Sequence, residues 1–155
     1  MKEEFLIRAM GAQDYARVSE IMDQVQRLHV EWRPDVYRPN YPLITAAYFE
    51  ECLNRGGWYV AEADGKVAGV MELMRRHVED NVRVTRDVLY IATMAVDAPF
   101  RGRGIGHAFF KKAKQIRDEQ GLSAVELQVN AKNTQAMEMY KACGFTVKSV
   151  NMELI

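Results

Sequence analysis

Residues 88–106 read VLYIATMAVDAPFRGRGIG, an apolar run followed by a turn that holds three glycines. The run from Val88 to Val96 is apolar enough to be buried on both faces, which is typical of a central strand. Beyond the turn, apolar side chains recur at helical spacing from Ile105 to Ile116, and Gly121 is a natural end for that helix. We therefore predict a buried strand, a glycine turn and an amphipathic helix in direct succession.

The glycine turn is a candidate anion site. Gly102, Gly104 and Gly106 let the backbone approach a ligand closely, while N–H groups and the helix dipole face one point, which suits a pyrophosphate. Arg101 and Arg103 add positive charge at the same place. The spacing fits neither a P-loop, which ends in Gly-Lys-Ser/Thr, nor a dinucleotide fingerprint. The alternative is a tight turn whose glycines serve packing alone.

The remaining elements follow from periodicity and turn residues. The pair Asp64-Gly65 between two strand-like runs indicates a hairpin, and alternation in 123–130 predicts a strand parallel to the central one after a right-handed crossover. Strands are expected over 5–10, 58–63, 67–74, 88–96, 123–130 and 146–154, and helices over 14–32, 45–54, 105–120 and 133–143. The order is β-α-α-β-β-β-α-β-α-β in one domain, 1–155.

Composition argues against several classes of function. The 155 residues include 21 Lys plus Arg and 21 Asp plus Glu, so the chain has no net positive charge that would attract nucleic acid or anionic lipid. We expect neither as a partner. Cys52 and Cys143 are far apart and lack metal-ligand spacing, so we expect no metal. The longest apolar run is too short to span a bilayer, and residues 1–4 do not begin a leader sequence. A cytoplasmic protein is the expectation.

Two motifs carry a resemblance to a known family. Arg101-x-x-Gly104-x-Gly106 resembles the Gln/Arg-x-x-Gly-x-Gly/Ala motif of the GNAT superfamily of acyl-CoA-dependent N-acetyltransferases. Residues 133–145, NTQAMEMYKACGF, are similar to that family's second signature, Asn-x-x-Ala-x-x-x-Tyr-x-x-x-Gly-Phe. The resemblance covers nearly the whole chain. It implies an α/β (α+β) fold with a central mixed, mostly antiparallel twisted sheet of about six strands and helices on both faces.

The resemblance also implies acetyl-CoA as co-substrate and a role for each motif residue. A bulge in the central strand would separate it from its parallel neighbour and expose backbone groups for the pantetheine arm and the thioester carbonyl. The residues implied at this bulge are Met94, Ala95 and Val96. The backbone amides implied to hold the pyrophosphate are those of Arg101, Gly102, Arg103, Gly104, Ile105 and Gly106.

Three residues are implied in the chemical step or beside it. The Val96 N–H is the candidate donor to the tetrahedral oxyanion, an effect worth roughly 2.7 to 4 kcal/mol per donor in acyl-transfer enzymes. Asn133 would hydrogen-bond the pantetheine arm, and its alternative role is a helix cap. Tyr140 would be the general acid for the departing thiolate, and its alternative role is core packing.

Tyr90 marks a departure from the family pattern, because many members carry a glutamate general base at this point of the central strand. A lysine-type amine with a pKa of about 10.4 is neutral only about once in 2,500 molecules at pH 7, whereas an α-amino group with a pKa of about 7.8 is neutral roughly once in seven. The missing base therefore favours α-amino acceptors. The alternative bases are Glu72, on the neighbouring strand, and Asp87 through an ordered water.

The acceptor wall is expected between the first two helices. Residues 28–41 are rich in aromatics and in both charges, and their candidate substrate-binding residues are Trp32, Tyr37 and Tyr41. Tyr90 of the central strand is a further candidate. Only 11 residues follow Gly144, fewer than the longer terminal hairpin common in the family. We expect a homodimer, in which a second subunit supplies that wall or covers an edge strand.

These inferences define an N-acetyltransferase in which a bound amine attacks acetyl-CoA directly, with no metal and no covalent enzyme intermediate. An amino acid, a peptide N-terminus, a polyamine or another small amine remains open as acceptor. The alternative is a non-catalytic acyl-CoA sensor or interaction module on the same fold. Tyr90 and the short terminal segment favour that alternative.

Overall fold

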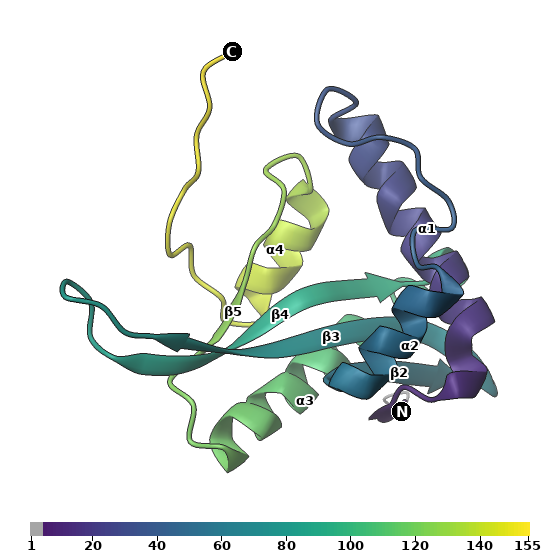
Figure 1. Ribbon diagram of the computed structural model, residues 1–155, viewed down its shortest axis with the longest axis horizontal. Helices are drawn as coiled ribbons and strands as arrows, with labels where there is room; N and C mark the ends of the chain where they lie inside the picture. The colour runs from purple at the N-terminus through teal and green to yellow at the C-terminus, as the bar shows by residue number, and fades with distance from the viewer. Residues whose placement is uncertain (1–4) are drawn as a thin grey trace.

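The computed structural model describes residues 5–155, and residues 1–4, in which we expect no leader sequence, lie outside the described residues. Its elements, labelled in Figure 1, are β1 (Leu6–Ala9), η1 (Ala12–Asp14), α1 (Tyr15–Trp32), α2 (Ala46–Arg55), β2 (Trp58–Ala63), β3 (Lys66–Val78), β4 (Arg86–Val96), η2 (Ala98–Phe100), α3 (Ile105–Glu119), β5 (Val125–Leu127) and α4 (Thr134–Ala142). None of the helices within 5–155 has the length and apolar character that crossing a bilayer requires.

The sheet has five strands in the order β1-β2-β3-β4-β5. All neighbours are antiparallel except β4 and β5, which are parallel because α3 carries the chain across between them. The β3–β4 hairpin is much longer than its neighbours and projects from the body of the molecule (Figure 1). The expected mixed, mostly antiparallel sheet and the predicted strand-turn-helix unit are both confirmed.

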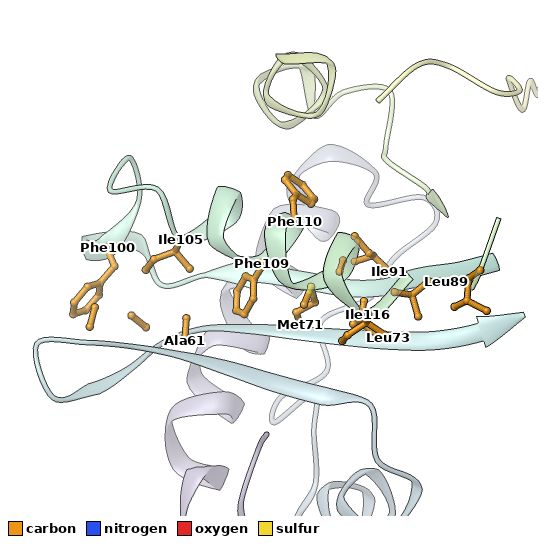
Figure 2. Packing of buried hydrophobic residues seen from close by; sticks show 14 residues of the cluster. Ala61, Met71, Leu73, Leu89, Ile91, Phe100, Ile105, Phe109, Phe110 and Ile116 are labelled. Atoms are coloured by element: carbon orange, nitrogen blue, oxygen red, sulfur yellow. The ribbon is translucent and has the colours of Figure 1, made fainter. Parts of the chain in front are cut away.

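Two apolar cores lie on opposite faces of the sheet. On one face, Ile105 and Phe109 of α3 pack onto Met71 of β3, and Figure 2 shows Phe110 pointing the other way, away from the sheet. On the other face, α1 and α2 cover the sheet through fully or nearly fully buried side chains. Because residues 67–73 of β3 and 88–91 of β4 are covered on both sides, these parts of the two strands read as nearly continuous apolar runs in sequence.

The strand predicted over 146–154 is not formed. Residues 146–155 pair with no strand of the described chain, and β5 spans only Val125–Leu127 instead of 123–130. Figure 1 shows this yellow segment leaving α4 and running clear of the sheet. Met152 and Leu154 are 87% and 101% exposed, so their alternating apolar pattern finds no face to bury against. The sheet therefore has five strands instead of about six.

The irregularity of β4 lies earlier than Met94–Val96, where the sequence analysis places it. Ile91 and Thr93 pair with consecutive residues of β3, so Ala92 between them is the extra residue. Residues 94–96 pair regularly with β3, because Ala95 packs into the core beneath α1. The bulge follows directly after Ile91 and Leu127, the last pair that joins β4 to β5, and the two strands separate there.

Candidate active site

Beyond Ile91, β4 continues without a partner on its β5 side. The N–H of Asp97 donates to the carbonyl of Ala68 in β3 at 2.8 Å. Successive N–H groups of a strand point to alternate sides, so those of Met94 and Val96 point away from β3 and towards the side that β5 leaves. The opening between β4 and β5 therefore presents two backbone donors.

The glycine turn connects this open strand to α3. Gly102 and Gly104 have φ values of 78° and 97°, in the left-handed region that favours glycine. No heavy atom lies within 4 Å of the position a Cβ would take on Gly102, so the turn is open there. A Cβ on Gly106 would lie 3.2 Å from Met139 Sδ, so α4 packs closely on the first turn of α3.

Both arginines of the turn are engaged. Arg101 Nε donates to the carbonyl of Val96 at 3.1 Å and folds the turn back onto the end of β4. Arg103 pairs with Asp64 at 3.0 Å, and its guanidinium lies 5.1 Å from the centre of the Phe100 ring. An open glycine backbone, a helix N-terminus and two arginines are suited to a pyrophosphate.

Asn133 and Tyr140 lie at the two ends of α4. Asn133 Oδ1 accepts from the N–H of Ala136 at 3.3 Å, so the side chain caps the helix and leaves its amide NH₂ for another partner. Tyr140 packs edge-on against Phe110, with ring centroids 5.6 Å apart, and burial raises the pKa of its phenol. Within residues 5–155 its hydroxyl has no hydrogen-bond partner. It is a protonated donor at neutral pH.

A buried acid ties the turn to α1. Asp97 is 5% exposed, accepts from Gln24 Nε2 at 2.7 Å and pairs with Arg17, which also bonds the Val67 carbonyl. Burial by itself raises the pKa of Asp97, but the hydrogen bonds from Gln24 and Arg17 outweigh it and hold that pKa below its usual range. Sequence reasoning missed these residues, because only the folded chain brings α1 to the end of β4.

The opposite wall of the opening is the sheet face beneath α1 and α2. Glu72 and Thr93 are cross-strand partners on this face, and Glu72 is 7% exposed. Arg55 Nη2 of α2 donates to Glu72 Oε1 at 2.9 Å, and Thr93 Oγ1 lies 3.5 Å from Oε2. A carboxylate is therefore held beside the point where β4 and β5 part.

Tyr90 shares that face, and Asp87 does not. The Tyr90 ring is 9% exposed and lies under the guanidinium of Arg76, 3.3 Å from its centroid. Asp87 is three residues away, so its side chain points to the other face, where it bonds His77 at 2.8 Å. Of the two alternative bases, the structure brings only Glu72 to the opening.

The expected acceptor wall is partly assembled. His29 packs between Trp32 and Tyr37, with ring centroids 5.9 Å and 4.8 Å away, and burial lowers the pKa of its imidazole. Tyr41 lies apart from them, beneath Arg27 at 4.9 Å. Lys132, from the loop before α4, donates to the carbonyl of Trp32 at 2.9 Å. This contact joins the end of α1 to the segment that carries Asn133.

Sequence reasoning missed Arg55 and Arg76 as residues of this wall. The period-2 alternation of β3 contained a signal for one of them, because Arg76 lies four residues after Glu72 and so on the same face. Nothing in the sequence indicated that α2 would bring Arg55 to Glu72, since that contact depends on how the helix docks.

Comparison with protein families and known proteins agrees with this geometry. The model of the Acetyltransferase (GNAT) family matches residues 22–145. A protein of Methanocaldococcus jannaschii, named an uncharacterized N-acetyltransferase, is 36% identical over 105 residues, 66% of this chain and 46% of that protein. Human N-acetylaspartate synthetase is 34% identical over 88 residues, 57% of this chain and 27% of that enzyme. The chain thus spans less than half the length of these relatives.

Solved structures show the same architecture. A mutant form of a Bacillus halodurans protein superimposes with a TM-score of 0.87 at 27% identity, covering 97% of this chain and 98% of that one. An aminoglycoside N-acetyltransferase in complex with CoA superimposes with a TM-score of 0.73 at 18% identity, covering 98% and 94%. At that identity the second likeness concerns the fold alone.

Proposed function

Because this chain belongs to the acetyltransferase (GNAT) family, we propose that it transfers an acetyl group from acetyl-CoA to an amine by direct attack of the amine on the thioester. The observation that carries the proposal is the continuity of β4, the glycine turn and α3. One end of this unit offers the N–H groups of Met94 and Val96, and the other offers the open backbone at Gly102. A thioester and a pyrophosphate joined by a pantetheine arm need such a pair of sites.

The residues proposed to bind acetyl-CoA stabilise the negative charge that develops on the thioester during the reaction. When the amine attacks, the thioester carbonyl oxygen becomes an oxyanion, and the N–H of Val96, with that of Met94 beside it, donates to this oxygen. Asn133 uses its free amide NH₂ on the pantetheine arm. Tyr140 donates a hydrogen bond to the leaving sulfur. With a pKa raised above that of a thiol, the phenol stabilises the thiolate better than it protonates it.

The acceptor side must take a proton from the amine. Glu72 is a buried carboxylate beside the opening on the α1–α2 face, and we assign it this role. Its ion pair with Arg55 holds it in place. Since Tyr90 stands where many family members carry a glutamate base, an α-amino group, whose ordinary pKa is below that of a lysine-type amine, is the favoured acceptor.

The acceptor lies between Tyr90 and the segment with Trp32, Tyr37 and Tyr41. The human relative is by name a synthetase of N-acetylaspartate, the product of acetylating an amino acid, which agrees with an amino-acid acceptor for this chain. A homodimer in the cytoplasm remains part of the proposal. The exposed apolar side chains of 146–155 support it, because a second subunit would bury them.

The test is to incubate the protein with acetyl-CoA and a panel of amines and to record released thiol and the mass of the product. The panel contains free amino acids, a peptide with a free N-terminus, a polyamine and an aminoglycoside. Acetylation of any of these above the uncatalysed rate is the expected result. Saturable acetyl-CoA binding with no product from any class would instead support the non-catalytic acyl-CoA sensor.

A further inference from the structure

Arg76 differs from the other arginines of the β3–β4 hairpin in its partner. Arg75 pairs with Asp87 at 3.4 Å, Arg83 with Asp80 at 2.5 Å, and Arg86 approaches Glu126 at 3.9 Å. Arg76 has no carboxylate partner among residues 5–155, and its guanidinium lies over the Tyr90 ring instead. Arg76 is thus an exposed arginine of the hairpin whose guanidinium N–H groups donate to no residue of the described chain.

The stack places this guanidinium at the opening between β4 and β5. Tyr90 pairs with Glu126 of β5, and the next pair, Ile91 with Leu127, is the last before the strands separate. The cations that contact Glu126 are Lys148 at 2.6 Å and Arg86 at 3.9 Å, and Arg76 is not one of them. The guanidinium therefore lies over the face that also carries Glu72, next to the proposed thioester site.

The geometry favours a planar anion as the ligand of Arg76. A guanidinium that lies on an aromatic ring keeps its N–H edges free, and those edges match the two oxygens of a carboxylate. The ring also restricts the arginine to one orientation, which lowers the entropy lost on binding.

The spacing along β3 agrees with a small acceptor. Arg76 reaches back over Tyr90, and Tyr90 is the cross-strand partner of Met74. Two residues of strand separate Met74 from Glu72, about 7 Å along the strand. An amine near Glu72 and a carboxylate near Arg76 can belong to one amino acid.

We propose that Arg76 binds a carboxylate of the acceptor, so that the acceptors are amines that carry a carboxylate, with free amino acids as the class. This assignment rests on the proposed acetyl transfer and deepens it. Arg76 is then the specificity-determining residue, and Tyr90, in place of a base, is the platform that orients it.

The test compares matched acceptors in the wild type and in two variants. The acceptors are alanine, leucine, phenylalanine and lysine, each against its α-carboxamide, and aspartate against asparagine. We expect the wild type to prefer the member with the additional carboxylate by about 10- to 100-fold in kcat/KM for at least one pair. Arg76→Ala should reduce that preference to within about 3-fold, and Arg76→Lys should restore part of it.

Arg75→Ala is the matched control, because Arg75 is the adjacent arginine, lies on the opposite face and pairs with Asp87. It should keep the wild-type preference. Equal rates for acid and amide in every pair, or a preference that survives Arg76→Ala, would overturn the assignment.

A binding measurement separates this proposal from the transfer reaction itself. Thermal shifts are recorded with the same pairs in the presence of CoA, which prevents turnover. If no amine is acetylated but an acid still stabilises the wild type more than its amide, and Arg76→Ala abolishes the difference, the transferase proposal fails and Arg76 is a carboxylate-binding site without a role in transfer. No difference in binding and none in turnover would refute Arg76 as the carboxylate site.

Discussion

Gln24 Nε2 of α1 donates to Asp97 Oδ1 at 2.7 Å, and its Oε1 accepts from the N–H of Ala98 at 3.1 Å. One side chain thus fixes the residue that ends β4 and the residue that begins the path to the glycine turn. Arg17 completes the contact from two helical turns nearer the N-terminus. Helix α1, which borders the proposed acceptor site, and the glycine turn, which is proposed to bind acetyl-CoA, are therefore held in a fixed relative position by the buried Asp97.

Asp97→Asn should cost about 2–3 kcal/mol of unfolding free energy at pH 7, because it leaves Arg17 without its buried partner. The pKa of Asp97 is lowered in the folded state, so its contribution is present above the unfolded pKa of about 3.9 and is lost as pH falls through the lower folded value. Denaturant unfolding at pH 7 and pH 3 should show that the difference in unfolding free energy between wild type and variant is smaller at pH 3. Glu20→Gln, at the exposed partner of Arg17, should change stability by less than about 0.5 kcal/mol. A difference in unfolding free energy that does not change with pH would contradict the assignment of Asp97 as an ionised partner of Arg17.

Gly102→Ala should weaken acetyl-CoA binding by about 10-fold, because a methyl group would enter the open backbone where the pyrophosphate lies. Gly121→Ala is the control, since that glycine also has a positive φ and open space around its Cβ position. Both variants should lose about 1 kcal/mol of stability from backbone strain. Calorimetric titration should find a higher Kd for Gly102→Ala alone, and equal Kd values would remove the turn from the binding site.

Tyr140→Phe should lower kcat by about 10- to 100-fold, the value of one hydrogen bond to a developing thiolate. The ring contacts with Phe110 and Phe145 remain, so the Tm should change by little. Steady-state kinetics should show an unchanged KM for acetyl-CoA. Tyr59→Phe, on β2, serves as the control and should leave kcat as it is. A variant as active as the wild type would assign Tyr140 to packing.

Glu72→Gln should lower kcat/KM by about 100-fold or more and alter its dependence on pH, because the amine would lose its proton acceptor. Glu62→Gln is a matched control, since Glu62 is also paired with an arginine, Arg8 at 2.8 Å, but on β2. It should keep the wild-type rate. If Glu72→Gln gives an unchanged pH profile, the proton leaves by another route and the acceptor enters as a free amine.

The parts of the fold that sequence predicts are those in which the signal is local. Three glycines after an apolar run and a 3.6-residue period after them predict β4, the turn and α3 without knowledge of any partner. The strand expected over 146–154 fails for the converse reason. Its alternation from Val150 to Leu154 is that of a strand, but a strand forms only beside a neighbour, and β5 ends after Leu127.

The candidate site divides in the same way. Asn133 and Tyr140 could be assigned from a motif, and Glu72 could be placed on the right face by counting alternate residues. The position of the bulge at Ala92, the stack of Arg76 on Tyr90 and the pair of Arg55 with Glu72 depend on register and on helix docking. No pattern within one segment encodes these relationships.

The most direct test of the central claim is a thermal-shift titration with acetyl-CoA, run beside ATP as a phosphate control. A ligand at 100 times its Kd adds roughly 2.7 kcal/mol to the folded state, which corresponds to a rise in Tm of about 5–10 °C for a chain of this size. The account predicts a saturable rise with acetyl-CoA and none with ATP. No shift with acetyl-CoA, or an equal shift with both, would contradict a coenzyme site built from β4, the glycine turn and α4.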